Sequence, residues 1–252
     1  NLFDEESGWI RPKDISGKWL LPFDPYKYSD GFVESNAAQS TWFVPHNLKE
    51  LAKLMGGKDA AVEKLNRQFI ESEKLNFTSG NSHAVEKHPE YRRIPINYGN
   101  QPSIQTAFIF NHLGRPDLAQ YWSRQVIDKA YSQLGTGTGY SGDEDQGLMG
   151  SLAVLMKIGL FQLNGGTEKN PEYQIGSPLF EKVEIQLHPD YYPGEKLAIS
   201  TERESNNALV VKTASFNGNS AESSRFKHNE LVKGGELKLQ LRDLSDAQTK
   251  TK

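Results

Sequence analysis

The 252-residue chain contains no cysteine, which excludes disulfide bonds, thiolate nucleophiles and thiolate metal sites. Any bound metal must therefore have oxygen or imidazole ligands. A positive charge excess is also missing, because 29 Lys and Arg stand against 32 Asp and Glu, for a formal net charge of −3. This weak acidity argues against nucleic acid or an anionic membrane surface as the main partner.

Long apolar segments are absent as well. No apolar run approaches the roughly 18 residues that a membrane-spanning helix needs, so we expect no membrane span. The chain also lacks a G-x-S-x-G element, a P-loop, a Rossmann glycine pattern and an H-E-x-x-H zinc motif, the usual signatures of acyl transfer, nucleotide chemistry and zinc sites. It starts at Asn1 with neither an initiator Met nor a signal peptide, which is typical of a processed product or of a piece of a longer protein.

The apolar pattern divides the chain into two predicted parts. Residues 1–31 have no clear period but many aromatic residues, which indicates a long loop pinned by its rings. Helical periodicity then predicts helices over 35–44 and 146–159, with others between them. After about residue 165 the period becomes two, which indicates antiparallel strands with one wet face. We therefore predict an α+β chain, with a helical segment over 1–165 and a small antiparallel β-sandwich over 166–252.

The acidic stretch 142–147 is the most informative for chemistry. In an extended loop, Asp143 and Asp145 would point the same way, just before a helix whose N-terminal dipole favours ionised carboxylates. Two such carboxylates could activate a water molecule or hold a hard cation; the alternative is a solvated acidic cap on the helix, which is an ordinary feature of helix N-termini. An EF-hand fits poorly, because Val154 stands where that loop needs Glu.

Two further segments could carry chemistry. Glu34 stands among apolar residues at a predicted helix start, where a raised pKa would suit a general acid; a plain helix cap is the alternative. Residues 97–102 gather amide oxygens that suit Ca²⁺ or sugar hydroxyls, and here the alternative is a turn followed by a helix that Pro102 begins.

Taken together and in order, these segments resemble one family. Residues 32–47, around Glu34, resemble the general-acid segment of the family 92 α-mannosidases, and 54–57 resemble the element that follows it. Residues 98–103 resemble the family's calcium segment, and 139–147 its catalytic-base segment. Residues 173–180 resemble the entry to its closing β-domain. The resemblance spans nearly the whole chain, from about residue 2 to about 241.

The resemblance implies a calcium-dependent exo-α-mannosidase that inverts the anomeric centre, built as part of an (α/α)6 helical barrel followed by β-sandwich material. By position, Glu34 would be the general acid, and Asp143 and Asp145 would supply the general base. The resemblance further implies that Ca²⁺ is held by Asn100, Gln101 and Asp143. It implies that the substrate is contacted by Gln39, Asn97 and Tyr98.

The resemblance also implies the partners. These are a mannose-containing glycan and the N-terminal part that family members carry before the acid segment. Because polymannose glycans lie outside cells or in the bacterial periplasm, we expect the protein to be secreted or periplasmic. Members that cleave α-1,2 linkages tend to carry a His-Glu pair where this chain has Asn97 and Tyr98, so no linkage preference carries over. Two alternatives remain open: a carbohydrate-binding or structural fragment without turnover, and another helical-barrel hydrolase acting on glucose- or rhamnose-containing glycans.

Overall fold

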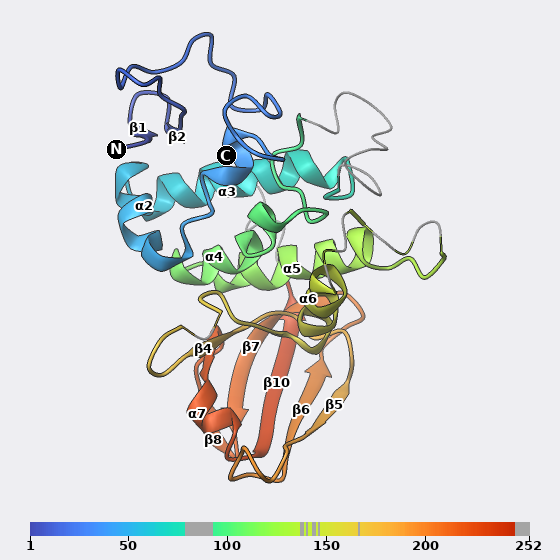
Figure 1. Cartoon of the computed structure of the whole chain (residues 1–252). Coiled ribbons are helices and arrows are strands. Elements are labelled where there is room, and N and C mark those ends of the chain that lie inside the picture. The colour runs from blue at the N-terminus through green and yellow to red at the C-terminus, as the bar shows by residue number, and fades with distance from the viewer. Residues whose placement is uncertain are drawn as a thin grey trace.

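The computed structural model describes residues 1–78, 93–136, 139, 141–142, 145, 147–165 and 167–244. Helices occupy the first part of the chain and strands the second, with the helices packed over one end of the sheets (Figure 1). The α+β class expected from the change of period is confirmed. No helix among the described residues is long and apolar enough to cross a membrane.

The helical part contains the elements α1 (Ala37–Ser40), η1 (Pro45–Asn47), α2 (Leu48–Leu54), α3 (Lys58–Glu73), η3 (Gln101–Ser103), α4 (Thr106–His112), α5 (Pro116–Ala130) and α6 (Leu148–Ile158). Glycines with positive φ end several of them, such as Gly114 after α4 and Gly159 after α6. Proline begins α5 at its first position, where no N–H is needed.

One predicted helix is much shorter than expected. The helix over 35–44 is wrong in extent, because α1 spans only four residues, capped by the Asn36 side chain. Val44 precedes Pro45, whose ring keeps the preceding residue out of the helical region, and Val44 has φ −130° and ψ 54°. The chain turns after Ser40 instead and brings Trp42 into the core, where its ring nitrogen donates to Gln68.

A large aromatic core holds the helices together. Phe69 of α3 stacks on Trp122 of α5, with ring centroids 5.2 Å apart, and both are buried. The Trp122 ring nitrogen donates to Asn66 at 2.7 Å, so the indole satisfies its polar atom inside the core. Burial of each such aromatic side chain stabilises the fold by roughly 1.5–3 kcal/mol. These contacts hold α3 against α5.

The N-terminal segment is a long loop held by its aromatic rings, as predicted, and cations that the sequence did not indicate pack on those rings. It contains only the two-residue strands β1 (Phe3–Asp4) and β2 (Trp9–Ile10). The Lys64 ammonium of α3 lies 3.3 Å from the centroid of the Trp9 ring, and the Arg11 guanidinium lies 4.4 Å from that of Phe23. Such cation–π contacts hold irregular backbone against the helices.

The strand part forms two sheets around a second core. The five-stranded sheet has the order β5 (Lys182–Gln186), β6 (Lys196–Arg203), β10 (Gly235–Asp243), β7 (Ala208–Phe216), β8 (Asn219–Ala221). The three-stranded sheet has the order β3 (Leu160–Phe161), β4 (Glu172–Ile175), β9 (Arg225–Lys227), and the short helix α7 (His228–Leu231) follows β9. Leu160, Ile175 and Phe226 share one core cluster with Leu239 and Leu241, so the two sheets form a sandwich.

The sandwich differs from expectation in one pairing. β10 runs parallel to β6, with Leu237 beside Ile199, whereas its other neighbour β7 is antiparallel. The alternation of apolar and polar residues reports which face is buried but not the direction of the neighbouring strand. The predicted purely antiparallel arrangement is therefore wrong for this pair alone.

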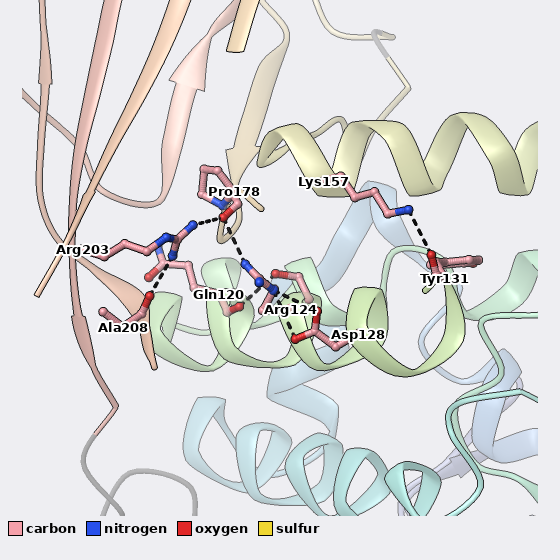
Figure 2. Close-up of polar contacts among 9 residues, drawn as sticks. Gln120, Arg124, Asp128, Tyr131, Lys157, Pro178, Arg203 and Ala208 are labelled. Carbon is pink, nitrogen blue, oxygen red and sulfur yellow. Dashed lines mark hydrogen bonds and ion pairs between the residues drawn. The ribbon is translucent and has the colours of Figure 1, made fainter. Parts of the chain in front are cut away.

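Helix α5 attaches the sandwich to the helical part. Gln120 accepts from the Val211 backbone at 2.8 Å and donates to the Ser223 carbonyl at 2.9 Å. The carbonyl of Pro178 accepts from both Arg124 of α5 and Arg203 of β6 (Figure 2). The division of the chain near residue 165 stays a prediction; β3 lies before it, and Phe161 packs in the helical core.

Candidate active site

Three segments far apart in sequence meet at one junction. Asn100 donates from Nδ2 to the backbone carbonyl of Glu34 at 2.7 Å. Its Oδ1 accepts from the Gln101 backbone N–H at 2.9 Å, and the Gln101 Nε2 donates to a carboxylate oxygen of Asp145. The predicted acid, calcium and base segments are thus joined in one hydrogen-bonded series, which sequence spacing alone cannot show.

The two described carboxyl candidates have unusual backbones. Glu34 has φ 53° and Asp145 has φ 47°, in the left-handed region that non-glycine residues rarely adopt. Both residues are exposed. Such conformations cost of order 1–3 kcal/mol each and persist where the surrounding structure holds them. The strain therefore accompanies two of the three residues for which catalytic chemistry was predicted. Asp143 lies outside the described residues.

The calcium segment is held rigidly from behind. Asn97 accepts the Gly99 N–H through its side-chain oxygen at 2.9 Å and donates its own N–H to Ser103. The Tyr98 ring is fully buried, and its hydroxyl accepts the Ala107 N–H of α4 at 3.1 Å. Burial raises the pKa of Tyr98 to about 12, so this hydroxyl stays protonated at all physiological pH values.

The acid segment is hydrogen-bonded to the main chain just before the calcium segment. Gln39 and Asn36 both donate from their side-chain amides to the Ile94 carbonyl, at 2.8 and 3.1 Å. Gln39 is 1% exposed, and its side-chain oxygen is buried without a hydrogen-bond partner among the described residues. Three residues predicted to touch the substrate, Gln39, Asn97 and Tyr98, thus have buried side chains that engage protein groups.

The base segment is fastened to the calcium segment by close backbone packing. Thr78 donates to the Ser141 carbonyl, and the Ser141 hydroxyl donates to the Ala130 carbonyl at the end of α5. A Cβ on Gly142 would overlap the backbone of Gly99, and one on Gly99 would overlap Ser141. The two glycines are therefore needed for a close approach of two loops rather than for a turn.

This packing makes a stability prediction. Gly142→Ala should lower the free energy of unfolding by about 1–3 kcal/mol, because its methyl group overlaps fixed backbone. Gly150→Ala is the matched control: Gly150 is exposed within α6, where alanine favours the helix by about 1 kcal/mol. Urea unfolding of the three proteins measures both changes. An alanine at 142 that is as stable as the parent would show that the two loops are not in contact.

The oxygen donors at the junction suit a hard cation. Among the described residues, no three His, Asp or Glu side chains gather closely enough to hold a metal ion. The junction instead offers the amide groups of Asn100 and Gln101 beside the Asp145 carboxylate. Amide and carboxylate oxygens are ligands that Ca²⁺ accepts, so the donor chemistry fits calcium, with Asp143 outside the described residues.

The junction is not enclosed by the described residues. A hollow of about 680 Å³ lies beside the base segment, lined by residues that include Ser141, Gly147 and Met149. Neither Glu34 nor Gln101 lines it. A binding pocket normally buries most of its ligand, and the described residues do not form such an enclosure at this junction.

Some residues that build the site carried no clear functional signal in the sequence. Asn36 could have been found, since it stands three residues before Gln39 in a helix-capping pattern. Ser141 lies in the predicted base segment, but its contacts, like those of Thr78 and Tyr131, could not be predicted, because their partners are 33 to 63 residues away or belong to main chain. Hydrogen bonds to distant carbonyls leave no periodic pattern.

Known proteins resemble this chain along almost its entire length. The chain is 29% identical to a family GH92 inverting mannosidase of Bacteroides thetaiotaomicron VPI-5482, with a TM-score of 0.75 over 98% of the chain and 33% of that structure. A second family GH92 α-mannosidase of Bacteroides thetaiotaomicron shares the fold, at 23% identity and a TM-score of 0.77, over 99% of the chain and 31% of that structure. An uncharacterized secreted glycosidase of Arthroderma benhamiae is 26% identical over 246 residues, 93% of the chain and 28% of that protein.

The chain spans about a third of the length of these relatives. The structural likeness and the family match extend over the acid, calcium and base segments. The model of the glycosyl hydrolase family 92 catalytic domain matches residues 1–243. The chain therefore belongs to glycosyl hydrolase family 92.

Proposed function

We propose that this chain forms the catalytic C-terminal part of a calcium-dependent, inverting exo-α-mannosidase that removes terminal α-linked mannose from glycans. The observation that carries the proposal is the junction itself, where the Glu34 backbone, Asn100, Gln101 and Asp145 form one hydrogen-bonded series. A family-related inverting mannosidase of 29% identity supports the reaction type.

Inverting hydrolysis needs two carboxyl groups in opposite protonation states, roughly 6.5–9.5 Å apart, with a water molecule between the base and the sugar. In this proposal Glu34 protonates the oxygen of the departing glycan. Asp143 and Asp145 take a proton from the attacking water, and the donated bond from Gln101 orients Asp145. Water attacks the face of the sugar opposite the departing group, so the product has the inverted configuration.

Calcium, when bound, would supply positive charge beside two sugar hydroxyls. Asn100, Gln101 and Asp143 would hold it, and the buried position of Asn100 gives that part of the site a fixed geometry. Gln39, Asn97 and Tyr98 then act in the proposal as supports of the acid and calcium segments, because their side chains bond to protein groups.

The open junction indicates what else the activity needs. We propose that the walls of the sugar pocket come from a preceding part of the same enzyme, since the chain matches only a third of its relatives' length. We also propose that the protein is exported from the cell, because the related glycosidase of Arthroderma benhamiae is secreted and polymannose glycans lie outside cells.

The direct test is hydrolysis of an α-mannoside by the complete protein, with and without a calcium chelator. We expect activity with calcium, a loss of at least about 100-fold after chelation, and recovery on adding Ca²⁺ but not on adding buffer alone. Released mannose is measured at several chelator concentrations. A complete protein that hydrolyses the α-mannoside at full rate without calcium would contradict the calcium part of the proposal. One that hydrolyses an α-glucoside or α-rhamnoside instead would favour the alternative helical-barrel hydrolase.

A further inference from the structure

We propose that Tyr131 is a positioning residue that fixes the distance between the calcium segment and the base segment. The inference rests on the proposed function and adds a residue to it. Tyr131 directly follows α5, is 6% exposed, and belongs to none of the three segments that carry the predicted chemistry. Its contacts nevertheless reach the calcium segment and the helix α6 that directly follows the base segment.

The hydroxyl of Tyr131 bonds to the calcium segment. It donates to the Tyr98 carbonyl at 2.5 Å, and the two rings pack edge to face with centroids 6.4 Å apart. The N–H of Tyr98 donates to the Phe77 carbonyl at 2.7 Å. Both sides of Tyr98 are thus held, and its carbonyl belongs to the peptide that leads through Gly99 into Asn100. The Tyr131 hydroxyl therefore sets the position of the Asn100 side chain through the Tyr98 main chain.

The rest of Tyr131 bonds to the helix that follows the base segment. Its backbone carbonyl accepts from the Lys157 ammonium of α6 at 3.0 Å (Figure 2). Its hydroxyl also lies 3.7 Å from the Met149 sulfur in the first turn of α6. The N–H of Leu148 at the start of this helix donates to the Asp145 carbonyl at 3.3 Å, so the position of α6 sets the position of Asp145.

One buried side chain therefore connects both halves of the site. The Tyr131 hydroxyl contacts both the Tyr98 carbonyl and the Met149 sulfur at the start of α6. Asp145 and Gln101 bond to each other only if Asn100 and α6 keep their spacing. Removing the hydroxyl leaves a buried carbonyl without its donor and loosens that spacing, while the ring itself can stay in place.

The test compares Tyr131→Phe with Tyr121→Phe in the complete protein. Tyr121 lies on α5, the helix that Tyr131 follows; it is half-buried, and its ring packs on Trp122, so the same atom is removed away from the calcium segment. Calcium affinity is measured by calorimetric titration of the chelator-treated proteins with CaCl₂. We expect Tyr131→Phe to raise the calcium Kd about tenfold and to lower kcat at saturating calcium by a similar factor, with Tyr121→Phe unchanged in both.

Several outcomes separate this inference from the proposed function. If the parent protein binds calcium and Tyr131→Phe binds it equally well with an unchanged kcat, the inference is overturned and the proposed function stands. A lower Tm with unchanged calcium Kd would mark Tyr131 as merely structural and overturn the inference too. A parent protein that binds no calcium would overturn the calcium part of the proposed function first.

A second variant covers the case in which Tyr131→Phe does not fold. Lys157→Met removes the bond to the Tyr131 carbonyl from a half-buried position but keeps the hydroxyl. We expect a calcium Kd about threefold higher than that of the parent protein. An unchanged Kd in this variant would overturn the connection between α6 and the calcium segment.

Discussion

Glu34→Gln is expected to lower the turnover of natural α-mannosides about 10²- to 10⁴-fold, the usual contribution of a positioned general acid. The amide keeps the size of the side chain but has no proton to give to the departing oxygen. The bond from Asn100 to the Glu34 backbone carbonyl does not involve the side chain, so the backbone arrangement should survive. The loss should fall mainly on kcat and far less on KM.

The choice of substrate sharpens this test. The phenolate of an aryl α-mannoside with an acidic phenol departs without being protonated. Glu34→Gln should therefore retain much more activity on such a substrate than on a mannobiose. Glu195→Gln, an exposed glutamate of the sandwich part, is the matched control and should behave as the parent protein. Equal losses on both substrates would contradict a general-acid role for Glu34, and full activity on mannobiose would exclude it.

Asp145→Asn is expected to lower kcat by a similar 10²- to 10⁴-fold, because an amide cannot take a proton from the attacking water. Asparagine suits the site structurally: it tolerates the positive φ of 47° at this position and can still accept the bond from Gln101. The measurement is mannoside hydrolysis at saturating calcium, so that a loss of turnover is not confused with a loss of metal.

Azide makes the test specific for a base. It is already an anion and needs no deprotonation, so it should restore the turnover of an aryl mannoside by Asp145→Asn while leaving Glu34→Gln unchanged. The matched control is Asp190→Asn, since the Asp190 side chain is 81% exposed in the sandwich part and distant in sequence. An Asp145→Asn enzyme that keeps full activity, with Asp143→Asn inactive, would assign the base to Asp143 alone.

The sequence predicted the elements whose causes are local. Pro116 and Gly114 marked where one helix begins and another ends, and the alternation around Leu239 marked a half-buried strand. The sequence-based prediction failed where the structure of an element depends on residues that pack against it. Pro45 and the burial of Trp42 shortened α1, and the direction of β10 depends on β6, which the alternation does not encode.

The candidate site shows the same division. The resemblance gave the order of the acid, calcium and base segments, and the family match over residues 1–243 includes all three. The contacts that join them come from backbone carbonyls, such as Tyr98 with Tyr131 and Ile94 with Gln39, which carry no side-chain identity to read. The burial of Tyr98 in the aromatic core was also beyond reach, because an isolated tyrosine suits a core and a sugar site equally well.

The anomeric form of the first product tests the central claim most directly. The complete, calcium-loaded protein is mixed with an α-mannoside, and the released mannose is followed by proton NMR before its anomers equilibrate. The two-carboxyl site around Glu34 and Asp145 predicts β-mannose as the first product, with α-mannose growing in later. α-Mannose as the first product would contradict the inverting mechanism, and no release of mannose from any α-mannoside would contradict the proposed activity as a whole.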